Sequence, residues 1–283
     1  MKENKFLECL KILELFFPKE DKKDIFKRFC SELMETGYNV RKDCAKYNVK
    51  PHVFNKEMID LYSKSDAFIY ELLIVALEKD TVKKRNFIKK KIKEHFKKNN
   101  KIKILCFGDG IGSDSLSFAK LGFNVTYFDI KGKISDFANL NFKLNKVDKL
   151  IRTIFNSSNL LENSYDVVIC REVLEHLKNP FETVIKLRSY LKNNGICFIS
   201  ESFSSVKKEF PTHLSSNLKY VNKTIEITVK VGFQHLETYN QTNLNMFKKV
   251  SSIDTSRFKS IPNIPWNVRF KKKIRDKIIF LLS

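Results

Sequence analysis

The chain has 283 residues, of which 42% are hydrophobic and 12% aromatic. This apolar content excludes an intrinsically disordered chain, and the length suits one large domain with an appendage. The formal net charge is +21, and no apolar run approaches the ~20 residues of a membrane-spanning helix. Because acidic residues interrupt the apolar pattern at the start of the chain, we expect no signal peptide and a cytoplasmic location.

Cysteine spacing argues against two common functions. None of the six cysteines lies in a C-x-x-C pair, so zinc-ribbon and thioredoxin-like sites are not expected. Cys106, Cys170 and Cys197 fall inside short apolar runs. We expect them to act there as small hydrophobic side chains in a reducing compartment.

The positive charge has two interpretations. Only nine of the 53 basic residues are Arg, and Lys, Asn, Ile and Phe, which A/T-rich codons encode, dominate the chain. A compositional bias explains such a pattern, whereas a nucleic-acid or anionic-lipid partner is the alternative. The charge is concentrated in residues 79–103, with twelve basic and two acidic residues. Ile88, Ile92 and Phe96 within this segment predict an amphipathic helix with a basic, solvated face.

Residues 1–100 are predicted to form an all-helical N-terminal extension. Apolar spacings of three and four predict helices near residues 6–17 and 25–34, and a short one near 54–62. A longer helix is expected after Ser65, whose hydroxyl is suited to cap it.

Residues 101–250 alternate short apolar runs with helical patterns, which is typical of a parallel sheet covered on both faces. The predicted strands are 102–107, 124–130, 150–155, 165–170, 196–200 and an antiparallel pair at 233–239 and 244–250. The predicted helices are 113–121, 134–144, 180–191 and 215–231. Residues 251–283 are predicted to form a basic tail with a terminal helix.

A glycine-rich segment, LCFGDGIGSD, places Gly108, Gly110 and Gly112 between a predicted strand and a predicted helix. Such a turn lets the backbone approach a ligand, and the N-terminus of the following helix favours polar or negative groups. The spacing G-x-G-x-G differs from the dinucleotide fingerprint, which would need glycine at Ser113. Asp129 ends the next strand, 19 residues after Gly110. Its carboxylate can accept hydrogen bonds from both hydroxyls of a ribose.

These residues, followed by SYDVVICREVLEHLKNP and LRSYLKNNGICFIS, resemble the class I S-adenosylmethionine-dependent methyltransferases. Within that family the chain is most similar to the group that includes the ubiquinone- and menaquinone-pathway methyltransferases. The resemblance covers roughly residues 101–250. It implies an α/β, Rossmann-like, doubly wound seven-stranded sheet whose last strand is antiparallel, and a methyltransferase activity (EC 2.1.1.-) with S-adenosyl-L-methionine as cofactor.

The resemblance also implies which residues hold the cofactor. The glycine loop would pack against its methionine and ribose, Asp129 would bind the ribose hydroxyls, and Ile130 would lie against the adenine. Asn156 or Ser157 would stand near the adenine amino group, where the family often has Asp. The expected cofactor-binding residues are Gly108, Asp109, Gly110, Gly112, Asp129, Ile130, Asn156, Ser157, Arg171 and Glu172.

Methyl transfer from a sulfonium requires in-line approach of a nucleophile, exclusion of water and in some cases a base, but no metal. Histidine is the natural base near neutral pH. His176 follows the fourth strand, at the edge where open parallel sheets bind ligands, and His213 lies in the later loop FPTHL. We take these two as the catalytic candidates; a capping or packing role is the alternative for His176.

The acceptor class is narrowed by missing motifs. Amino-methyltransferases that act on bases of DNA or RNA resemble one another in a [DNS]-P-P-[YFW] stretch after the fourth strand, and this chain has none. It also lacks the Pro-Cys dipeptide of cytosine-C5 methyltransferases. We therefore expect a small-molecule acceptor, methylated on oxygen: a sugar, a quinone-like compound or a secondary metabolite. Phe54, Tyr62, Phe68 and Tyr70 either form a lid that shapes its pocket or belong to the core.

Three alternatives remain at this stage. In an RNA methyltransferase, residues 40–59 would form a helix-turn-helix whose recognition face carries Lys50, His52, Asn55 and Lys56. In a membrane-associated form, the basic segment 268–282 would lie on an anionic bilayer instead of docking on the domain. The third alternative is a non-catalytic scaffold. The sequence does not indicate the oligomeric state.

Overall fold

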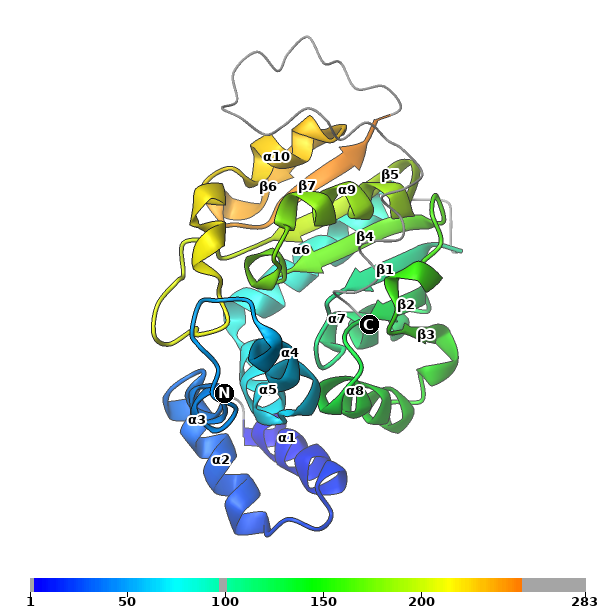
Figure 1. Ribbon diagram of the computed structural model, residues 1–283. Helices are drawn as coiled ribbons and strands as arrows, with labels where there is room; N and C mark the ends of the chain where they lie inside the picture. Colours follow the sequence, from blue (N-terminus) through cyan, green and yellow to red (C-terminus); the bar gives the residue numbers. More distant parts are fainter. Residues whose placement is uncertain (1–2, 97–100, 251–283) are drawn as a thin grey trace.

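The computed structural model describes residues 3–96 and 101–250; the predicted helix at 268–282 lies outside this range. Its strands form one seven-stranded sheet in the order β3-β2-β1-β4-β5-β7-β6 (Figure 1). β7 runs antiparallel to β5 and β6, and the other neighbours are parallel. The predicted doubly wound sheet is confirmed. The strands are β1 Lys103–Phe107, β2 Asn124–Phe128, β3 Ile151–Ile154, β4 Tyr165–Arg171, β5 Leu191–Ser200, β6 Phe233–Thr238 and β7 Asn245–Lys249.

Helices cover both faces of the sheet because successive strand residues point to opposite sides. The helices after β1 are α7 Ser113–Ala119, α8 Lys133–Leu144, α9 Pro180–Tyr190 and α10 Thr224–Lys230. Leu105 and Phe107 pack in one core with α9 and α10. Ile104 and Cys106 pack in another with α7, α8 and the preceding helix α6 (Lys79–His95). The cysteines of the strands are buried and free, as predicted. Among the described residues no helix is long and apolar enough to cross a membrane.

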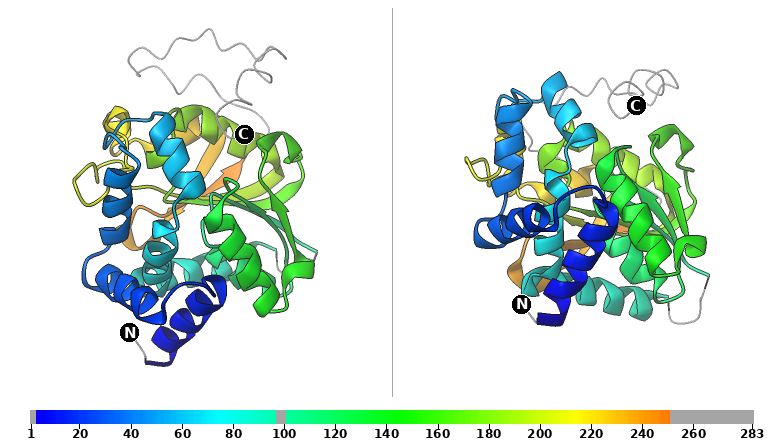
Figure 2. Two further views of the ribbon diagram at one scale, coloured as in Figure 1. Left: turned by 60° about the horizontal axis from the view of Figure 1, so that its bottom comes forward. Right: turned by 90° about the horizontal axis from the view of Figure 1, so that it is seen from below.

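Six helices precede the sheet: α1 Glu3–Phe16, α2 Lys22–Met34, α3 Tyr38–Lys46, α4 Lys56–Lys64, α5 Ala67–Leu77 and α6 Lys79–His95. The first five share a core of their own, which Ile134 and Phe137 of α8 complete. Figure 2 shows the blue helices clustered on one side of the molecule in both views. α6 instead buries Ile88 and Ile92 in the core beneath the sheet and leaves Lys90 exposed, so the predicted amphipathic basic helix is confirmed.

Two local predictions are corrected. Residues 215–231 are not one helix: a 3-10 helix over Ser215–Tyr220 and α10 are separated by Asn222, whose φ of +60° no right-handed helix can include. The strand predicted at 196–200 begins earlier, at Leu191, so residues 191–195 also belong to β5. The pairing of β4 with β5 shifts between Tyr165 and Val167, and the extra residues bulge out with Asn194 at φ +63°.

The helix-turn-helix prediction is wrong. Lys50, His52 and Asn55 lie in the loop between α3 and α4, and only Lys56 is on a helix. Asn55 accepts a hydrogen bond from the Met58 N–H at 2.9 Å and so caps α4. With its supposed recognition residues used in a loop and a cap, α4 presents no such face for a nucleic acid.

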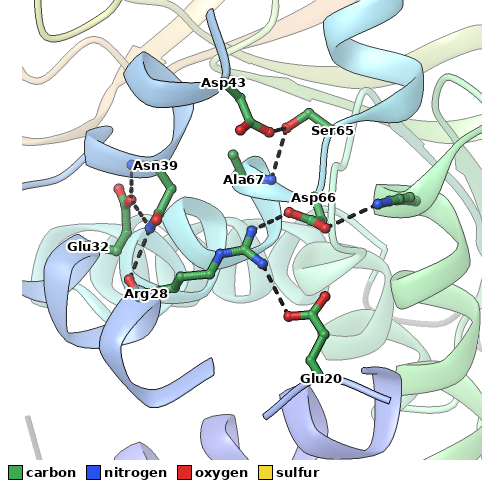
Figure 3. A network of polar contacts seen from close by, with 9 residues as sticks. Glu20, Arg28, Glu32, Asn39, Asp43, Ser65, Asp66 and Ala67 are labelled. Carbon is green, nitrogen blue, oxygen red and sulfur yellow. Dashed lines mark hydrogen bonds and ion pairs between the residues drawn. The ribbon is translucent and has the colours of Figure 1, made fainter. Parts of the chain in front are cut away.

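A charged network attaches the N-terminal helices to α8 (Figure 3). Asp66, at the start of α5, pairs with Arg28 of α2 and with Lys133 of α8. Burial alone would raise the pKa of Asp66, but the charges of Arg28 and Lys133 outweigh it and hold that pKa below its usual value. The Ser65 hydroxyl accepts the Ala67 N–H at 3.0 Å, which is the capping contact expected of it. The N-terminal helices are therefore joined to α8, the helix that follows β2.

We predict that Asp66→Ala lowers the free energy of unfolding by about 2–3 kcal/mol, because it leaves the Arg28 charge half-buried without its partner. The measurement is urea denaturation followed by circular dichroism. Since the folded-state pKa of Asp66 is depressed, the difference from wild type is full above its unfolded pKa of about 3.9 and disappears as the pH falls further.

The matched control is Glu20→Ala, which removes a more exposed partner of Arg28 at 3.4 Å. It is expected to cost less than about 1 kcal/mol. Equal losses for the two variants would contradict a bridging role for Asp66.

Candidate functional site

A cavity of about 820 Å³ lies where the carboxyl ends of β1, β2 and β4 meet the lid helices α4 and α5. Residues far apart in the sequence line it, including both histidines predicted to be catalytic. Of the predicted cofactor residues, Gly108, Asp109, Gly110, Asp129, Ile130, Asn156, Arg171 and Glu172 also line it. Gly112 and Ser157 do not, so Asn156 is the member of that pair that lines the cavity.

The glycine loop needs all three glycines. Gly108, Gly110 and Gly112 have φ values of +70°, +52° and +74°, which side-chain-bearing residues rarely adopt. A Cβ on Gly108 would meet the Val173 side chain at 2.6 Å, and one on Gly112 would meet the Phe142 ring at 2.4 Å. The loop is therefore both left-handed and closely packed from behind, which leaves its backbone facing the cavity.

Asp109 and Asp129 shape the loop in different ways. The Asp109 carboxylate accepts the N–H groups of Asp114 and Ser115 at 3.0 and 2.7 Å, and so caps α7. Asp129 accepts the Gly110 N–H at 2.6 Å and the Ile130 N–H at 2.7 Å. Burial raises the pKa of Asp129 to about 6, although these two bonds counteract it. A carboxylate has about four acceptor positions, so Asp129 keeps free positions for ligand hydroxyls.

A buried cluster of opposite charges lies beside the loop. Asp114 accepts from Arg171 Nη1 at 2.9 and 3.0 Å and from Arg85 Nε at 2.7 Å. Burial would raise the pKa of Asp114, but the two guanidinium groups lower it below its usual value. Two cations thus face one carboxylate, and the buried Arg171 Nε has no partner among the described residues. The positive charge of Arg171 in the cavity wall suits a carboxylate on the ligand. The sequence did not single out Arg85 or Asp114.

Glu172 follows β4 in a strained conformation, with φ of +53°. The Ser202 hydroxyl donates to it at 2.6 Å and the Asn243 amide at 3.0 Å. Burial would raise its pKa, but these donors and nearby cations lower it, so Glu172 stays ionised. Left-handed backbone at a non-glycine residue is costly and concentrates at functional sites. A fixed carboxylate here suits a ligand ammonium group.

The two predicted catalytic histidines lie together in the wall of the same cavity, with ring centroids 4.7 Å apart. Nδ1 of His176 is 2.9 Å from the Tyr62 hydroxyl and 3.2 Å from the Thr212 carbonyl. Because a carbonyl can only accept, this contact favours the tautomer with the hydrogen on Nδ1 and a lone pair on Nε2. Burial lowers the pKa of His176 to about 4, and burial with the His176 charge lowers that of His213 to about 3. Both rings are neutral near pH 7.

His52 joins two loops, a role that the sequence did not indicate. Its Nδ1 lies 2.9 Å from the His213 carbonyl, and its N–H donates to the Pro211 carbonyl at 2.7 Å. The Ser215 N–H in turn donates to the His52 carbonyl at 3.1 Å. The lid loop and the loop carrying His213 are therefore joined. No motif signals this, because the partners are about 160 residues apart.

Of the four aromatic residues predicted to form a lid or to belong to the core, three line the cavity and one lies in the core. Phe54, Tyr62 and Phe68 line the cavity. Tyr70 is fully buried in the core of the N-terminal helices, where the Arg28 guanidinium lies 4.2 Å above its ring. Phe68 and Tyr70 lie two positions apart on α5 and therefore point to different sides of the helix. Both sides are buried, one against the cavity and the other in the core.

Glu175, His176 and His213 form a group with the spacing of metal ligands, since one donor atom from each lies within 4.8 Å of the others. Glu175 Oε2 and His213 Nδ1 are buried and have no partner among the described residues. The expectation that methyl transfer here needs no metal stays a prediction, and this group is where a metal titration would test it.

A family described as a methyltransferase domain matches residues 81–247. The chain belongs to this family. Membership implies S-adenosylmethionine as cosubstrate and agrees with the resemblance of the glycine loop and Asp129. The match begins within α6, so this helix is part of the methyltransferase domain.

Individual proteins show the extent of the similarity. Over 126 residues the chain is 36% identical to a ubiquinone biosynthesis O-methyltransferase of Rickettsia typhi, covering 44% of this chain and 50% of that protein. The corresponding protein of Rickettsia canadensis is 37% identical over 127 residues, covering 44% and 52%. The methyltransferase domain thus spans about half the length of the curated relatives it matches. An O-methyltransferase family protein from Burkholderia thailandensis aligns with a TM-score of 0.47 and 12% identity, covering 66% and 59%.

We predict that Gly112→Ala destabilises the methyltransferase domain by about 1–3 kcal/mol more than Gly122→Ala, because it adds overpacking to backbone strain. Gly122 is a matched control: its φ is +85°, but a Cβ there would meet no atom within 4 Å. Thermal and urea unfolding of both variants measure the difference. Equal destabilisation would mean that the Phe142 ring is free to move aside.

Proposed function

We propose that this domain transfers the methyl group of S-adenosylmethionine to a hydroxyl oxygen of a small-molecule acceptor. The observation that carries the proposal is one continuous cavity with Asp129 and the glycine loop at one end and two neutral histidines at the other. Calorimetric titration with S-adenosylmethionine, followed by a radiolabelled methyl-transfer screen of hydroxylated compounds, tests it. Failure to bind the cofactor would end the proposal.

The residues present fit this cofactor. Asp129 has acceptor positions for ribose hydroxyls, and Ile130 and Asn156 follow it along the adenine side. At the other side of the loop, Arg171 lines the cavity, and its positive charge suits the methionine carboxylate. Glu172 is ionised and suits the methionine ammonium. A group carrying hydroxyls and both charges of an amino acid therefore matches the donors and acceptors in the wall.

When bound, S-adenosylmethionine supplies a methyl carbon made electrophilic by its sulfonium sulfur. The acceptor oxygen forms a bond to that carbon, the electrons of the breaking carbon–sulfur bond stay on sulfur, and the hydroxyl proton passes to a base. We assign the base to His176, whose Nε2 carries a lone pair at neutral pH, and a positioning role to His213. The lid helices exclude water from this step.

The cavity wall favours a small neutral acceptor over RNA. It carries ten Asp and Glu residues against six Lys and Arg, although the whole chain has a net charge of +21. A polyanion would be repelled from such a wall. Phe54, Tyr62 and Phe68 suit a flat apolar body, and the curated relatives are O-methyltransferases of ubiquinone biosynthesis. Among the acceptors considered, we favour a hydroxylated, quinone-like ring.

We predict that Asp129→Ala weakens S-adenosylmethionine binding by about 1.5–3 kcal/mol, the value of hydrogen bonds to a charged group. For the wild type, affinity should fall as the pH drops below about 6, because Asp129 then takes up a proton and loses acceptor positions. Calorimetry between pH 5 and 8 measures both effects. As a control, Ser157→Ala changes a residue outside the cavity wall and should leave affinity unchanged. A pH-independent affinity would contradict the assignment.

We predict that His176→Gln and His213→Gln lower kcat while S-adenosylmethionine affinity changes little. Because burial lowers the pKa values of both rings to about 4 and 3, the wild-type rate should show no inflection near the ordinary histidine pKa of 6.5. Steady-state rates between pH 5 and 8 and calorimetry on each variant supply the data. His235→Gln, outside the cavity, is the control. Full rates in both variants would remove histidine from the chemistry.

A further inference from the structure

One carboxyl group of the cavity has no role in the site described so far. Glu71, on α5 of the lid, lines the cavity, and no hydrogen bond or ion pair joins it to any residue in the described part of the chain. The carboxylates of Asp114, Asp129 and Glu172, by contrast, all accept hydrogen bonds from the protein.

No cation forms an ion pair or hydrogen bond with Glu71 among the described residues. The charged groups that act on it are Glu32 of α2 and Arg41 of α3, but Arg41 donates to the Thr36 carbonyl and to Glu35. Burial, followed by the Glu32 charge, raises the pKa of Glu71 to about 8, and Arg41 offsets only part of this. A carboxyl held in this way gains free energy from any partner that donates a hydrogen bond to it.

Glu71 lines the cavity together with Tyr62, which contacts His176 of the histidine pair. After burial, its charge is the main contribution that raises the pKa of the Tyr62 hydroxyl, which lies 2.9 Å from His176. The other walls here are aromatic, with Phe54, Phe68 and Phe210 lining the same cavity. An acceptor seated against these rings, with its reacting hydroxyl at His176, therefore meets Glu71 with another part of its body.

We propose that Glu71 is a specificity-determining residue that binds a second hydrogen-bond donor of the acceptor, either a hydroxyl or an ammonium group, and excludes acceptors with an anionic group at that position. This inference rests on the proposed methyl transfer to a small hydroxylated ring. The shared chemistry is a donor without negative charge, because a carboxylate ligand would face the acceptor oxygens of Glu71 within an apolar wall.

Three catechols that differ in the charge of their side chain serve as probes: 4-methylcatechol (neutral), dopamine (cationic) and 3,4-dihydroxybenzoate (anionic). Their binding is measured by calorimetry on the full chain saturated with S-adenosylhomocysteine, so that no turnover occurs, and their methylation is measured separately with S-adenosylmethionine. Above pH 8, where the Glu71 carboxyl is largely ionised, we expect the wild type to bind the anionic probe at least about ten-fold more weakly than the better of the other two.

Glu71→Ala should remove this discrimination, and Glu71→Lys should reverse it in favour of the anionic probe. Glu71→Gln, which keeps a hydrogen-bonding amide, should retain binding of 4-methylcatechol. Affinity for S-adenosylmethionine should be unchanged in all three variants, which also reports that they are folded. Glu78→Gln is the matched control, because Glu78 lines the same cavity at the end of α5 and should leave the ratios unchanged.

The outcomes separate the two proposals. A preference for dopamine that Glu71→Gln abolishes identifies an ammonium group as the donor. Equal binding of 4-methylcatechol and dopamine identifies a hydroxyl group as the donor. Unchanged ratios in Glu71→Ala and Glu71→Lys overturn the role of Glu71, even if methyl transfer occurs. Binding of none of the probes also overturns it. Charge-selective binding without any methylation supports Glu71 and instead contradicts the proposed function.

Discussion

The bond between the Asp129 carboxylate and the Gly110 N–H joins the ends of two neighbouring strands, and the rest of the site depends on it. It holds the glycine loop in its left-handed course and orients the carboxylate toward the cavity. A glycine turn with an acidic residue on the next strand is then one structural unit. Val173 and Phe142 stabilise the glycine loop, because they fill the space that side chains on Gly108 and Gly112 would occupy.

Burial gives the two ends of the cavity opposite electrostatic characters. Where we propose that S-adenosylmethionine binds, ionised groups are kept charged by partners: Asp114 by two arginines, and Glu172 by hydroxyl donors and nearby cations. At the acceptor end, partners are few, so burial keeps His176, His213 and Glu71 neutral near pH 7. A charged cosubstrate and an uncharged hydroxyl acceptor can thus be bound side by side in one space.

The N-terminal helices take part in this arrangement. Asp66 attaches them to α8 through Lys133, and His52 attaches their long loop to the segment that carries His213. The helical extension is thus joined to the methyltransferase domain at two places, and its residues contribute to the wall of the cavity.

The sequence by itself determined the doubly wound sheet, the glycine loop and its partner Asp129. These follow from local signals: apolar runs of strand length, glycines with no side chain to clash, and an acidic residue at a strand end. Even the two histidines were placed correctly at the cavity, because residues that follow parallel strands meet at one edge. Tertiary structure alone decided what His52, Arg85, Asp114 and Glu71 do, why Tyr70 is in the core, and why no helix-turn-helix forms. Those outcomes depend on contacts between segments distant in sequence, and on burial that shifts a pKa only once those segments have packed together.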